Sequence, residues 1–411
     1  MKHWKHWMMS TFTEQEQVYK NIAVAGAGAS GAFLTLLLGK NPYNNVFLFD
    51  EKPPFSTLLP TGGGRCNLTF EQKDVREFVK NYPRGDKFLL SVLSRFGVDR
   101  TRRLFNDLGI KTYVQEDNRV FPSSNSSVDV IKKLSSHLKG QNIHIIRENV
   151  VSVYKKTDGF ELGTKHSSYI FDKVVIATGG KGGGFKLAKS SGHKIVELKP
   201  SLTALDIKEK DFYSLSGLTF KSVSAKAIYN KNKYFAEGDM LFTHKSISGP
   251  LIFKISALSA YDEYSTENPL EISFRLTNVP PEQVESEIKN NSKKTIKNIF
   301  SKFAPEKFIS VILSVSNIDA NKQAAQIKKS EKEILMNALF DFKVHAVKRI
   351  KDSEIVTAGG VDLKEINPKT MESKITPGLY FTGEVLNIDG FTGGFNLQNC
   401  WSTAYICSVS I

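Results

Sequence analysis

Three glycines near the start of the sequence have a spacing that suggests chemistry. Gly26, Gly28 and Gly31 form a Gly-x-Gly-x-x-Gly pattern between two apolar runs. In a strand–turn–helix unit the first glycine permits a tight turn. The second lets the backbone approach a pyrophosphate, and the third lets helix and strand pack closely. Free backbone N–H groups and the helix dipole would stabilise the phosphate charge. The pattern predicts a dinucleotide-binding turn, and the alternative is a glycine-rich connector without a ligand.

An acidic residue comes directly after the next apolar run, which ends at residue 49. Asp50 is placed to accept hydrogen bonds from the ribose hydroxyls of an adenosine. Glu51 is the second candidate, because strand ends are uncertain by a residue. An acid at this position disfavours a 2′-phosphate, so the expected ligand is FAD or NAD rather than NADP.

A second glycine-rich segment, "LLPTGGGRCNLTF" at residues 58–70, also has the composition of a binding loop. Its three successive glycines allow backbone N–H groups to converge on an anion or a carbonyl oxygen. Arg65 adds a fixed charge, and Asn67 is a candidate cap for the segment after it. The alternative is an ordinary surface turn.

Two side chains are weaker candidates for direct chemistry. His244, in "LFTHKSISGP", could donate a proton. The structural alternative, which we favour, makes Ser248 a helix N-cap with Pro250 in the first helical turn. Cys66 beside Arg65 could have a lowered pKa, and the favoured alternative is a packed small residue.

Apolar patterning predicts the elements that position these residues. Residues 21–25 and 46–50 are typical of buried parallel strands, with a helix between them that completes a βαβ unit. The segment "KVVIATGG" at 173–180 predicts another strand that ends in glycines. Short alternating runs after residue 200 favour antiparallel strands, and residues 282–341 are helical in pattern and rich in lysine.

The pattern of the first part of the chain returns after residue 355, so we expect one α/β domain built from both ends of the chain. The expected division is a Rossmann-type domain at 20–199 and 353–411, an inserted β-rich domain at 200–280 and 342–352, a helical subdomain at 281–341, and an N-terminal tail at 1–19.

Composition excludes several classes of protein. The 411 residues are 40% hydrophobic and 24% charged, as in an ordinary globular protein. No apolar run approaches the ~18 residues of a membrane span, and the first residues lack the apolar core of a secretory signal. The net charge of +14 favours a solvated lysine-rich surface over a nucleic-acid, membrane or anion partner.

The three cysteines, Cys66, Cys400 and Cys407, form neither a CxxC pair nor a zinc-binding spacing. If Cys400 and Cys407 share a helix they lie about 10.5 Å apart, too far for the ~7 Å limit of a disulfide. We therefore expect no metal site and no dithiol redox centre, and a cytoplasmic location.

The order of the motifs resembles one family. The chain contains, in this order, GAGASG, TGGGRCNLT, RVFPSSNSSVDVIKKL, VVIATGG, MLFTHKSISGP and the segment from VTAGGVDL to STAY. In these motifs and in their order it resembles the BaiN/YhiN-type flavoproteins. These proteins are also called aminoacetone-oxidase-like NAD(P)/FAD-dependent oxidoreductases. The resemblance implies an α/β fold with a Rossmann-type FAD-binding domain, an inserted β-barrel-like domain and a small helical domain.

The resemblance also implies a set of FAD-binding residues. The residues at the pyrophosphate and adenosine would be Gly26, Gly28, Ala29, Ser30, Gly31, Asp50 or Glu51, and the backbone of Val150. Those along the rest of the cofactor would be Gly64, Arg65, Cys66, Asn67, Ala177, Thr178, Gly179, Gly383 and Glu384. Gly394, Phe395, Asn396 and Leu397 would place a helix N-terminus at the flavin.

That helix N-terminus would have a specific effect. A reduced flavin carries negative charge at N1 and O2, and a helix N-terminus offers free N–H groups and about half a positive charge. It would stabilise the reduced anion and raise the reduction potential. Phe391 and Phe395 either stack on the flavin or fill the core.

Two functions remain open at this point. The first is an FAD-dependent oxidoreductase that moves hydride between flavin N5 and an unidentified small organic substrate, with NAD(P)H as reductant or O₂ as acceptor. No second Gly-x-Gly-x-x-Gly comes after a strand, so NAD(P)H would bind transiently. The second is an FAD-bound binding or sensor protein, without turnover, that contacts nucleic acid or another protein through the basic insertion. We favour the enzyme, consider nucleic acid an unlikely partner, and find no pattern that defines an oligomeric state.

One departure from the family concerns the substrate side. The segment "KGGGFKLAKSSGH" after the ATGG strand is shorter than in relatives, and Asn387 replaces an expected acid. FAD binding should survive these changes, whereas substrate identity need not.

Overall fold

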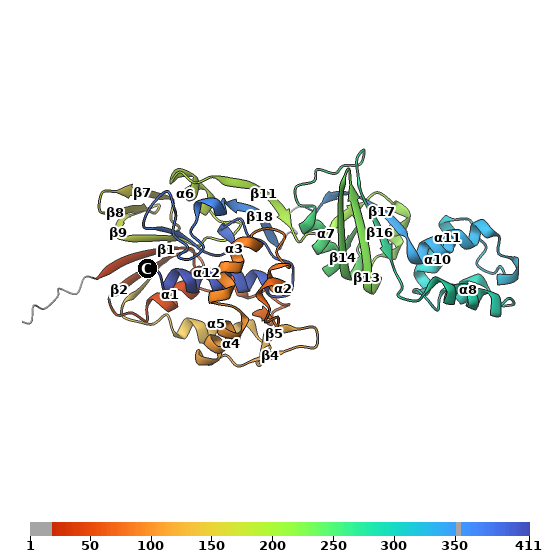
Figure 1. Ribbon diagram of the computed structural model, residues 1–411, viewed down its shortest axis with the longest axis horizontal. Coiled ribbons are helices and arrows are strands. Elements are labelled where there is room, and N and C mark those ends of the chain that lie inside the picture. Colours follow the sequence, from red (N-terminus) through yellow and green to blue (C-terminus); the bar gives the residue numbers. More distant parts are fainter. Residues whose placement is uncertain (1–18, 351–354) are drawn as a thin grey trace, which may run out of the picture.

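The computed structural model describes residues 19–350 and 355–411. Almost all of the expected N-terminal tail, and the expected boundary between residues 352 and 353, lie outside the described residues. Figure 1 shows an elongated molecule in which an α/β lobe, a β-barrel and a group of helices succeed one another along the long axis.

A five-stranded parallel sheet forms the centre of the α/β lobe. Its strands lie in the order β19-β10-β1-β2-β6, and every neighbouring pair is parallel. The strands are β1 (Lys20–Ala25), β2 (Asn44–Phe49), β6 (Ile143–Ile146), β10 (Lys173–Ile176) and β19 (Leu379–Phe381). The strands predicted at 21–25 and 46–50 are confirmed, although Asp50 lies just beyond the end of β2.

Two apolar helices from opposite ends of the chain pack together in this lobe. Helix α1 (Ala29–Leu38) contacts α12 (Phe395–Ser408), and the rings of Phe33 and Trp401 meet edge to face with centroids 5.0 Å apart. Nearly every residue of α1 is buried. The apolar run after the glycines therefore reflects a helix that is covered on all sides. Cys400 and Cys407 both lie on α12, and all three cysteines are free thiols.

Smaller elements surround the sheet. Helices α2 (Val75–Val79), α3 (Asp86–Arg95), α4 (Val98–Asp107), α5 (Ser127–Ser136) and α6 (Gly184–Ser190) belong to this lobe, with the short 3₁₀ turns η1 (Ser56–Leu58), η4 (Leu363–Glu365) and η5 (Gly383–Val385). One small antiparallel sheet contains β3 (Thr69–Phe70), β5 (Arg119–Pro122) and β4 (Thr112–Val114), and another contains β7 (Ser152–Lys156), β8 (Gly159–Gly163) and β9 (Ser168–Phe171). The antiparallel pair β11 (Ile195–Ser201) and β18 (Val356–Val361) leads from this lobe toward the barrel.

Six antiparallel strands close into a barrel in the order β12-β15-β14-β13-β16-β17. They are β12 (Leu205–Ile207), β13 (Thr219–Tyr229), β14 (Asn232–Phe242), β15 (Ser246–Ser248), β16 (Leu270–Arg275) and β17 (Phe342–Arg349), and the 3₁₀ turn η2 (Lys210–Leu215) comes after β12. Buried and more exposed residues alternate along β13, β14 and β16, as a barrel interior requires.

Helix α7 (Pro250–Leu258) packs against the barrel and begins differently from the sequence-based expectation. Pro250 occupies the first helical turn as predicted, but the N-cap is Gly249 and not Ser248. Gly249 has φ 99°, and a Cβ there would lie 2.8 Å from the carbonyl oxygen of Asp239. The close approach of β14 therefore selects glycine at the cap.

The helical group comes after β16 and returns the chain to β17. It contains α8 (Pro281–Asn290), α9 (Ile296–Phe300), α10 (Glu306–Val315), η3 (Ala324–Gln326) and α11 (Lys329–Phe340). Its buried face shares one apolar cluster with the barrel, in which Phe308 meets Phe220 and Phe342. The predicted fold class, a Rossmann-type α/β fold with an inserted barrel and helices, is confirmed.

Within residues 19–350 and 355–411, no helix has the length and apolar character that would allow it to cross a membrane. In the same part of the chain, no group of three or more His, Cys, Asp and Glu side chains is arranged to hold a metal ion.

Candidate functional site

The carboxyl ends of four parallel strands bring the predicted cofactor-binding segments to one edge of the sheet. The GAGASG turn comes after β1, Asp50 after β2, ATGG after β10 and TGE after β19. Because these strands are neighbours in the sheet, the four segments lie side by side. Ligands of open α/β sheets bind at this edge.

The three glycines of the turn differ in what surrounds them. A Cβ at Gly26 would lie 2.5 Å from the carbonyl oxygen of Ala177, and one at Gly31 would lie 1.9 Å from that of Gly26. At Gly28 the nearest atom would be Thr57 Oγ1, at 3.4 Å. Packing therefore demands glycine at two positions and leaves free space beside the third, where a pyrophosphate would need it.

Backbone donors at the start of α1 are arranged for an anion. The N–H of Ala27 donates to Asp50 Oδ2 (2.8 Å), and the N–H of Ala29 donates to Thr57 Oγ1 (3.2 Å). Within the described chain the N–H groups of Ser30 and Gly31 have no protein acceptor. They remain available to a phosphate at the helix N-terminus.

Asp50, rather than Glu51, lies over the glycine turn. Its carboxylate also accepts the N–H of Lys52 (2.8 Å), which fixes its orientation, whereas Glu51 is exposed. Of the two acids, Asp50 is the one held at the glycine turn, and its role toward a ribose stays a prediction.

The TGGGRCN loop is a run of left-handed backbone. Gly62, Gly63 and Gly64 have φ of 59°, 67° and 82°, and Cys66 has φ 64°. No atom lies within 4 Å of a Cβ built at Gly63 or Gly64, so the loop is open on that side. The Arg65 guanidinium lies 4.0 Å from the ring centroid of Phe121 and donates to Gln115 Oε1 (3.3 Å).

Cys66 is a packed residue and not a reactive thiolate. Its side chain is fully buried, and desolvation raises the pKa of the thiol to about 12 even though Thr61 forms a hydrogen bond with it. The suggestion that Arg65 lowers this pKa is therefore wrong.

Buried polar atoms without a partner surround the same edge of the sheet. Within the described residues, Asn67 Oδ1, Thr178 Oγ1, Thr382 Oγ1 and Asn387 Oδ1 are unpaired, as are both amide atoms of Asn399. Buried polar groups are nearly always hydrogen-bonded in a folded protein. A ligand rich in hydroxyl, phosphate and amide groups would satisfy them, so the residues present fit FAD.

Of the residues with these unpaired atoms, Asn67 and Thr178 are predicted from the sequence to contact the cofactor. Thr382, Asn387 and Asn399 are absent from the predicted cofactor-binding residues. Thr382 directly precedes the predicted pair Gly383 and Glu384, and Asn399 lies on the predicted helix. Both could have been found by extending those segments by a few residues.

Gly383 ties the end of β19 to the helices on either side. Its N–H donates to Thr403 Oγ1 (2.9 Å) on α12, and a Cβ there would lie 2.8 Å from the Cβ of Ser30 on α1. The Ser30 hydroxyl donates to the carbonyl oxygen of Cys400 (3.2 Å), which holds the same junction together.

Glu384 has an unusual titration. Burial, with a smaller contribution from the negative charge of Asp389, raises the pKa of its carboxyl to about 7, and Lys181 partly opposes this. In the unfolded chain the same carboxyl would ionise near its ordinary pKa of 4.5. Between these two values the folded state binds more protons, so stability is lost as the pH rises through 7.

We therefore expect Glu384→Gln to stabilise the apoprotein at pH 8 by on the order of 2 kcal/mol, and to have no effect near pH 4. Thermal unfolding at the two pH values measures this difference. The matched control is Glu51→Gln, which changes an exposed acid beside the same site and should alter stability by less than about 0.5 kcal/mol. An equal effect of Glu384→Gln at both pH values would contradict the expectation.

The helix predicted to face the flavin begins at Gly394, which has φ 102° and is the N-cap of α12. A Cβ there would lie 2.6 Å from the backbone of Thr69. Phe395 is buried, with its ring centroid 5.0 Å from those of both Phe70 and Phe78. Phe395 is expected from the sequence either to stack on the flavin or to fill the core, and these contacts place it in the core.

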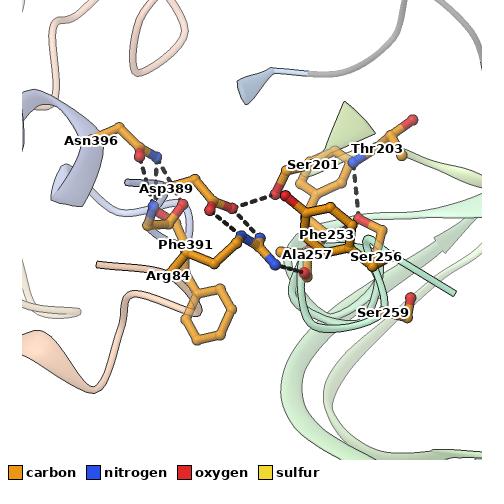
Figure 2. Close-up of polar contacts among 12 residues, drawn as sticks. Arg84, Ser201, Thr203, Phe253, Ser256, Ala257, Ser259, Asp389, Phe391 and Asn396 are labelled. Atoms are coloured by element: carbon orange, nitrogen blue, oxygen red, sulfur yellow. Dashed lines mark hydrogen bonds and ion pairs between the residues drawn. The ribbon is translucent and has the colours of Figure 1, made fainter. Parts of the chain in front are cut away.

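Asn396 fixes the turn that precedes this helix. Its side chain accepts the N–H of Gly390 (2.8 Å) and donates to the carbonyl oxygen of the same residue (2.8 Å), as Figure 2 shows. Phe391 is partly buried in this turn, and Leu397 is partly buried in the first turn of α12. The side chain of Asn396 therefore shapes the loop, whereas its backbone stays free for the predicted role.

A buried ion pair connects that loop to the barrel. Figure 2 shows the Arg84 guanidinium paired through two nitrogens with the carboxylate of Asp389, which is fully buried. Ser201, at the end of β11, donates to the same carboxylate (2.8 Å), and Arg84 donates to the carbonyl oxygen of Ala257 on α7 (3.0 Å). We call Arg84, Asp389, Ser201 and Ala257 the interdomain latch.

The remaining predicted residues have ordinary surroundings. His244 is exposed in the turn between β14 and β15, and Val150 is partly buried just before β7. Ala177 is buried and its N–H continues the sheet to Ala25 (2.8 Å), whereas Gly179 is partly exposed with φ 73°. The roles of these residues toward a cofactor stay predictions.

Comparisons with known proteins agree with this fold. The family model described as "HI0933-like protein Rossmann domain" matches residues 20–410. A 3-dehydro-bile acid delta(4,6)-reductase of Clostridium scindens is 30% identical over 406 residues, which cover 94% of this chain and 97% of that protein.

Two further relatives carry a different name. The ribosomal RNA dihydrouridine synthases of Escherichia coli and Haemophilus influenzae are 28% and 27% identical, cover 94% and 96% of this chain, and are themselves covered to 96% and 98%. Among solved structures, a 3-ketosteroid delta1-dehydrogenase from Sterolibacterium denitrificans aligns with a TM-score of 0.49 and 12% identity over 95% of this chain and 98% of that one.

Proposed function

Since this chain belongs to the HI0933-like family of Rossmann-domain proteins, we propose that it binds FAD and reduces a carbon–carbon double bond conjugated to a carbonyl group. The protein is an oxidoreductase of a flavoprotein family. The cofactor, the bond type and the source of electrons are the parts that we propose. The observation that carries the proposal is the set of unpaired buried polar atoms around the carboxyl edge of the sheet.

The names of the relatives point to one kind of bond. A 3-dehydro-bile acid with delta(4,6) unsaturation has its double bonds conjugated to the 3-oxo group. The C5–C6 double bond that is saturated in dihydrouridine is conjugated to the C4 carbonyl of uridine. FAD, when bound and reduced, supplies hydride to the carbon of such a bond that lies beta to the carbonyl group. A proton must then reach the carbon next to the carbonyl.

Residues from both ends of the chain would hold the cofactor. The open space at Gly28 and the N–H groups of Ser30 and Gly31 would receive the pyrophosphate, and Asp50 would bind the ribose hydroxyls. The N-terminus of α12 at Gly394 would face the flavin pyrimidine and stabilise negative charge there. His244, an exposed residue, has no contact that favours it as the proton donor.

The first test measures the flavin absorbance of the purified protein and its reduction by pyridine nucleotides. We expect the purified protein to be yellow, to release FAD on denaturation, and to be bleached anaerobically by NADPH or NADH. A soluble conjugated enone should then restore the yellow colour faster than buffer alone, whereas a matched saturated ketone should not. A protein that is colourless and cannot be reconstituted with FAD would overturn the proposal. Reoxidation by O₂ alone would leave only the oxidase alternative.

The proposal also includes a cytoplasmic location and the expected division into domains. These are a Rossmann-type domain at 20–199 and 353–411, a β-rich domain at 200–280 and 342–352, and a helical subdomain at 281–341. Cytoplasmic NAD(P)H would then be the reductant, bound transiently. The alternative of a flavin-bound protein without turnover predicts a yellow protein that no pyridine nucleotide bleaches.

A further inference from the structure

The outer face of the barrel carries a groove of about 730 Å³ that begins at the loop before α12. Phe391 of that loop lines one part of it, and Phe340 at the end of α11 lines another. Between them the groove is formed by side chains of β13, β14, β16 and α7. Phe391 stands three residues before Gly394, so the groove adjoins the segment predicted to hold the flavin.

Pairing of the strands sets the lining in two rows. Lys226 on β13 lies opposite Phe235 on β14 in one row. In the next row Ser224 lies between Glu237 and Arg275. Because side chains of neighbouring strands that share a row point to the same face, the cations and the aromatic ring meet outside the barrel.

Two of the three cations that line the groove have no acidic partner among the described residues. Lys226 and Arg275 form no ion pair with a carboxylate anywhere in the described chain. Arg275 donates instead to the carbonyl oxygen of Thr277 (3.1 Å), which orients the guanidinium. Lys254 donates to the backbone carbonyl oxygen of Glu237 (2.8 Å), and Glu237 is the one acid among the described residues that line the groove.

Phe235 gives the groove an exposed aromatic platform. Its side chain is 67% exposed, the largest exposure among the large hydrophobic residues of the described chain. A single exposed phenylalanine is common on protein surfaces, so the significance of Phe235 lies in the cations that line the same groove. Cations beside an exposed ring form the arrangement that holds single-stranded nucleic acid, with phosphates on the cations and a base on the ring.

We propose that this groove binds single-stranded RNA and places one of its pyrimidine bases near the loop before Gly394, where the flavin is predicted to lie. The inference rests on the proposed function, since a uracil ring contains the conjugated double bond that the enzyme would reduce. The sequence alone disfavours nucleic acid as a partner, because the lysines are scattered along the chain. The barrel and the adjoining helix α7 bring together Lys226, Lys254 and Arg275 from segments up to 49 residues apart.

A single strand fits the groove better than a duplex. Bases in a duplex are stacked on one another and cannot reach Phe235, whereas an unstacked base can lie on the ring. An apolar molecule would use the ring but would leave the cations without partners, and the experiment below distinguishes RNA from a second copy of the chain.

The experiment measures fluorescence anisotropy of a labelled single-stranded oligouridine of about 12 nucleotides, within the site sizes of such proteins. We expect Phe235→Ala and Phe235→Leu to weaken binding about 10-fold and Phe235→Trp to retain it, since the contact needs a ring. Lys226→Glu and Arg275→Glu should each weaken binding and lower the slope of log affinity against log salt by about 0.7.

Lys165→Glu is the matched control, because Lys165 is exposed in the turn between β8 and β9, which Figure 1 shows on the side of the α/β lobe that faces away from the barrel. It makes the same charge change and should leave binding within about twofold, since salt screens charges over such distances. A duplex RNA of equal length should bind at least about 10-fold more weakly than the single strand.

Equal binding by the barrel variants and the wild type would overturn the inference, as would equal binding of duplex and single strand. A change of oligomeric state in Phe235→Ala with unchanged RNA binding would assign the groove to protein contact and also overturn it. The barrel variants should remain yellow and be bleached by NADPH like the wild type. That readout separates failure of this inference from failure of the proposed function.

Discussion

Replacement of Arg84 by alanine is expected to lower the free energy of unfolding by about 3–5 kcal/mol, because it leaves a buried carboxylate without its counter-charge. Asp389 is fully buried and receives two nitrogens of Arg84, with the Ser201 hydroxyl as its other side-chain donor. One hydroxyl cannot replace the solvation that the carboxylate loses on folding. Urea unfolding of the apoprotein, monitored by circular dichroism, measures the loss.

Two variants make this expectation specific to the buried charge. Arg84→Ala combined with Asp389→Asn should lose less stability than Arg84→Ala alone, since a neutral amide needs no cation. Arg119→Ala removes an arginine whose partner Asp117 is largely exposed, and should cost about 0–1 kcal/mol. If Arg84→Ala and Arg119→Ala cost the same, the latch does not stabilise the fold.

The latch also predicts an effect at the cofactor. Asp389 lies in the loop that leads to the N-cap of α12, and Ala257 lies on α7, the helix that packs against the barrel. Phe391 packs with Leu202, Phe253 and Ala257 at the same junction. Loss of the ion pair should therefore loosen the loop before Gly394 as well as the contact between the two domains.

Replacement of Gly28 by alanine is expected to weaken FAD binding about 100-fold while the apoprotein stays within about 0.5 kcal/mol of the wild type. Gly28 has φ −68° and ψ −165°, which an alanine adopts without strain. The added methyl group would meet only Thr57 Oγ1, at 3.4 Å. The cost therefore falls on the ligand, whose pyrophosphate needs the space that the methyl group would fill. Fluorescence titration of the apoprotein with FAD measures the affinity.

Gly31→Ala is the matched comparison, because its methyl group would lie 1.9 Å from the carbonyl oxygen of Gly26. It should destabilise the apoprotein by about 3 kcal/mol, since α1 and β1 must separate. Substitution of Gly28 should thus lower the affinity for FAD, whereas substitution of Gly31 should lower the stability of the apoprotein. Normal FAD affinity in a folded Gly28→Ala protein would contradict the placement of the pyrophosphate.

Much of the carboxyl edge of the parallel sheet could be predicted from local sequence. The strand–glycine–helix pattern at residues 21–38 fixed the position of the turn, because the φ angles and close packing that it requires can be met only by glycine at Gly26 and Gly31. Asp50 could be placed for the same reason, since it comes directly after a strand whose apolar run defines its length. For Cys66 the sequence left two alternatives and favoured a packed residue, and the burial that decides between them depends on residues distant in sequence.

The sequence by itself determined the fold class and the segments at the carboxyl edge of the parallel sheet, because hydrophobic periodicity and glycine spacing act over a few residues. Only the tertiary structure brought Arg84 to Asp389 across 305 positions, and set Lys226, Phe235 and Arg275 on one face of the barrel. The ion pair of the latch depends on the burial of Asp389, and the lining of the groove depends on the register of β13, β14 and β16. Both properties arise from contacts between distant segments, which no local pattern encodes.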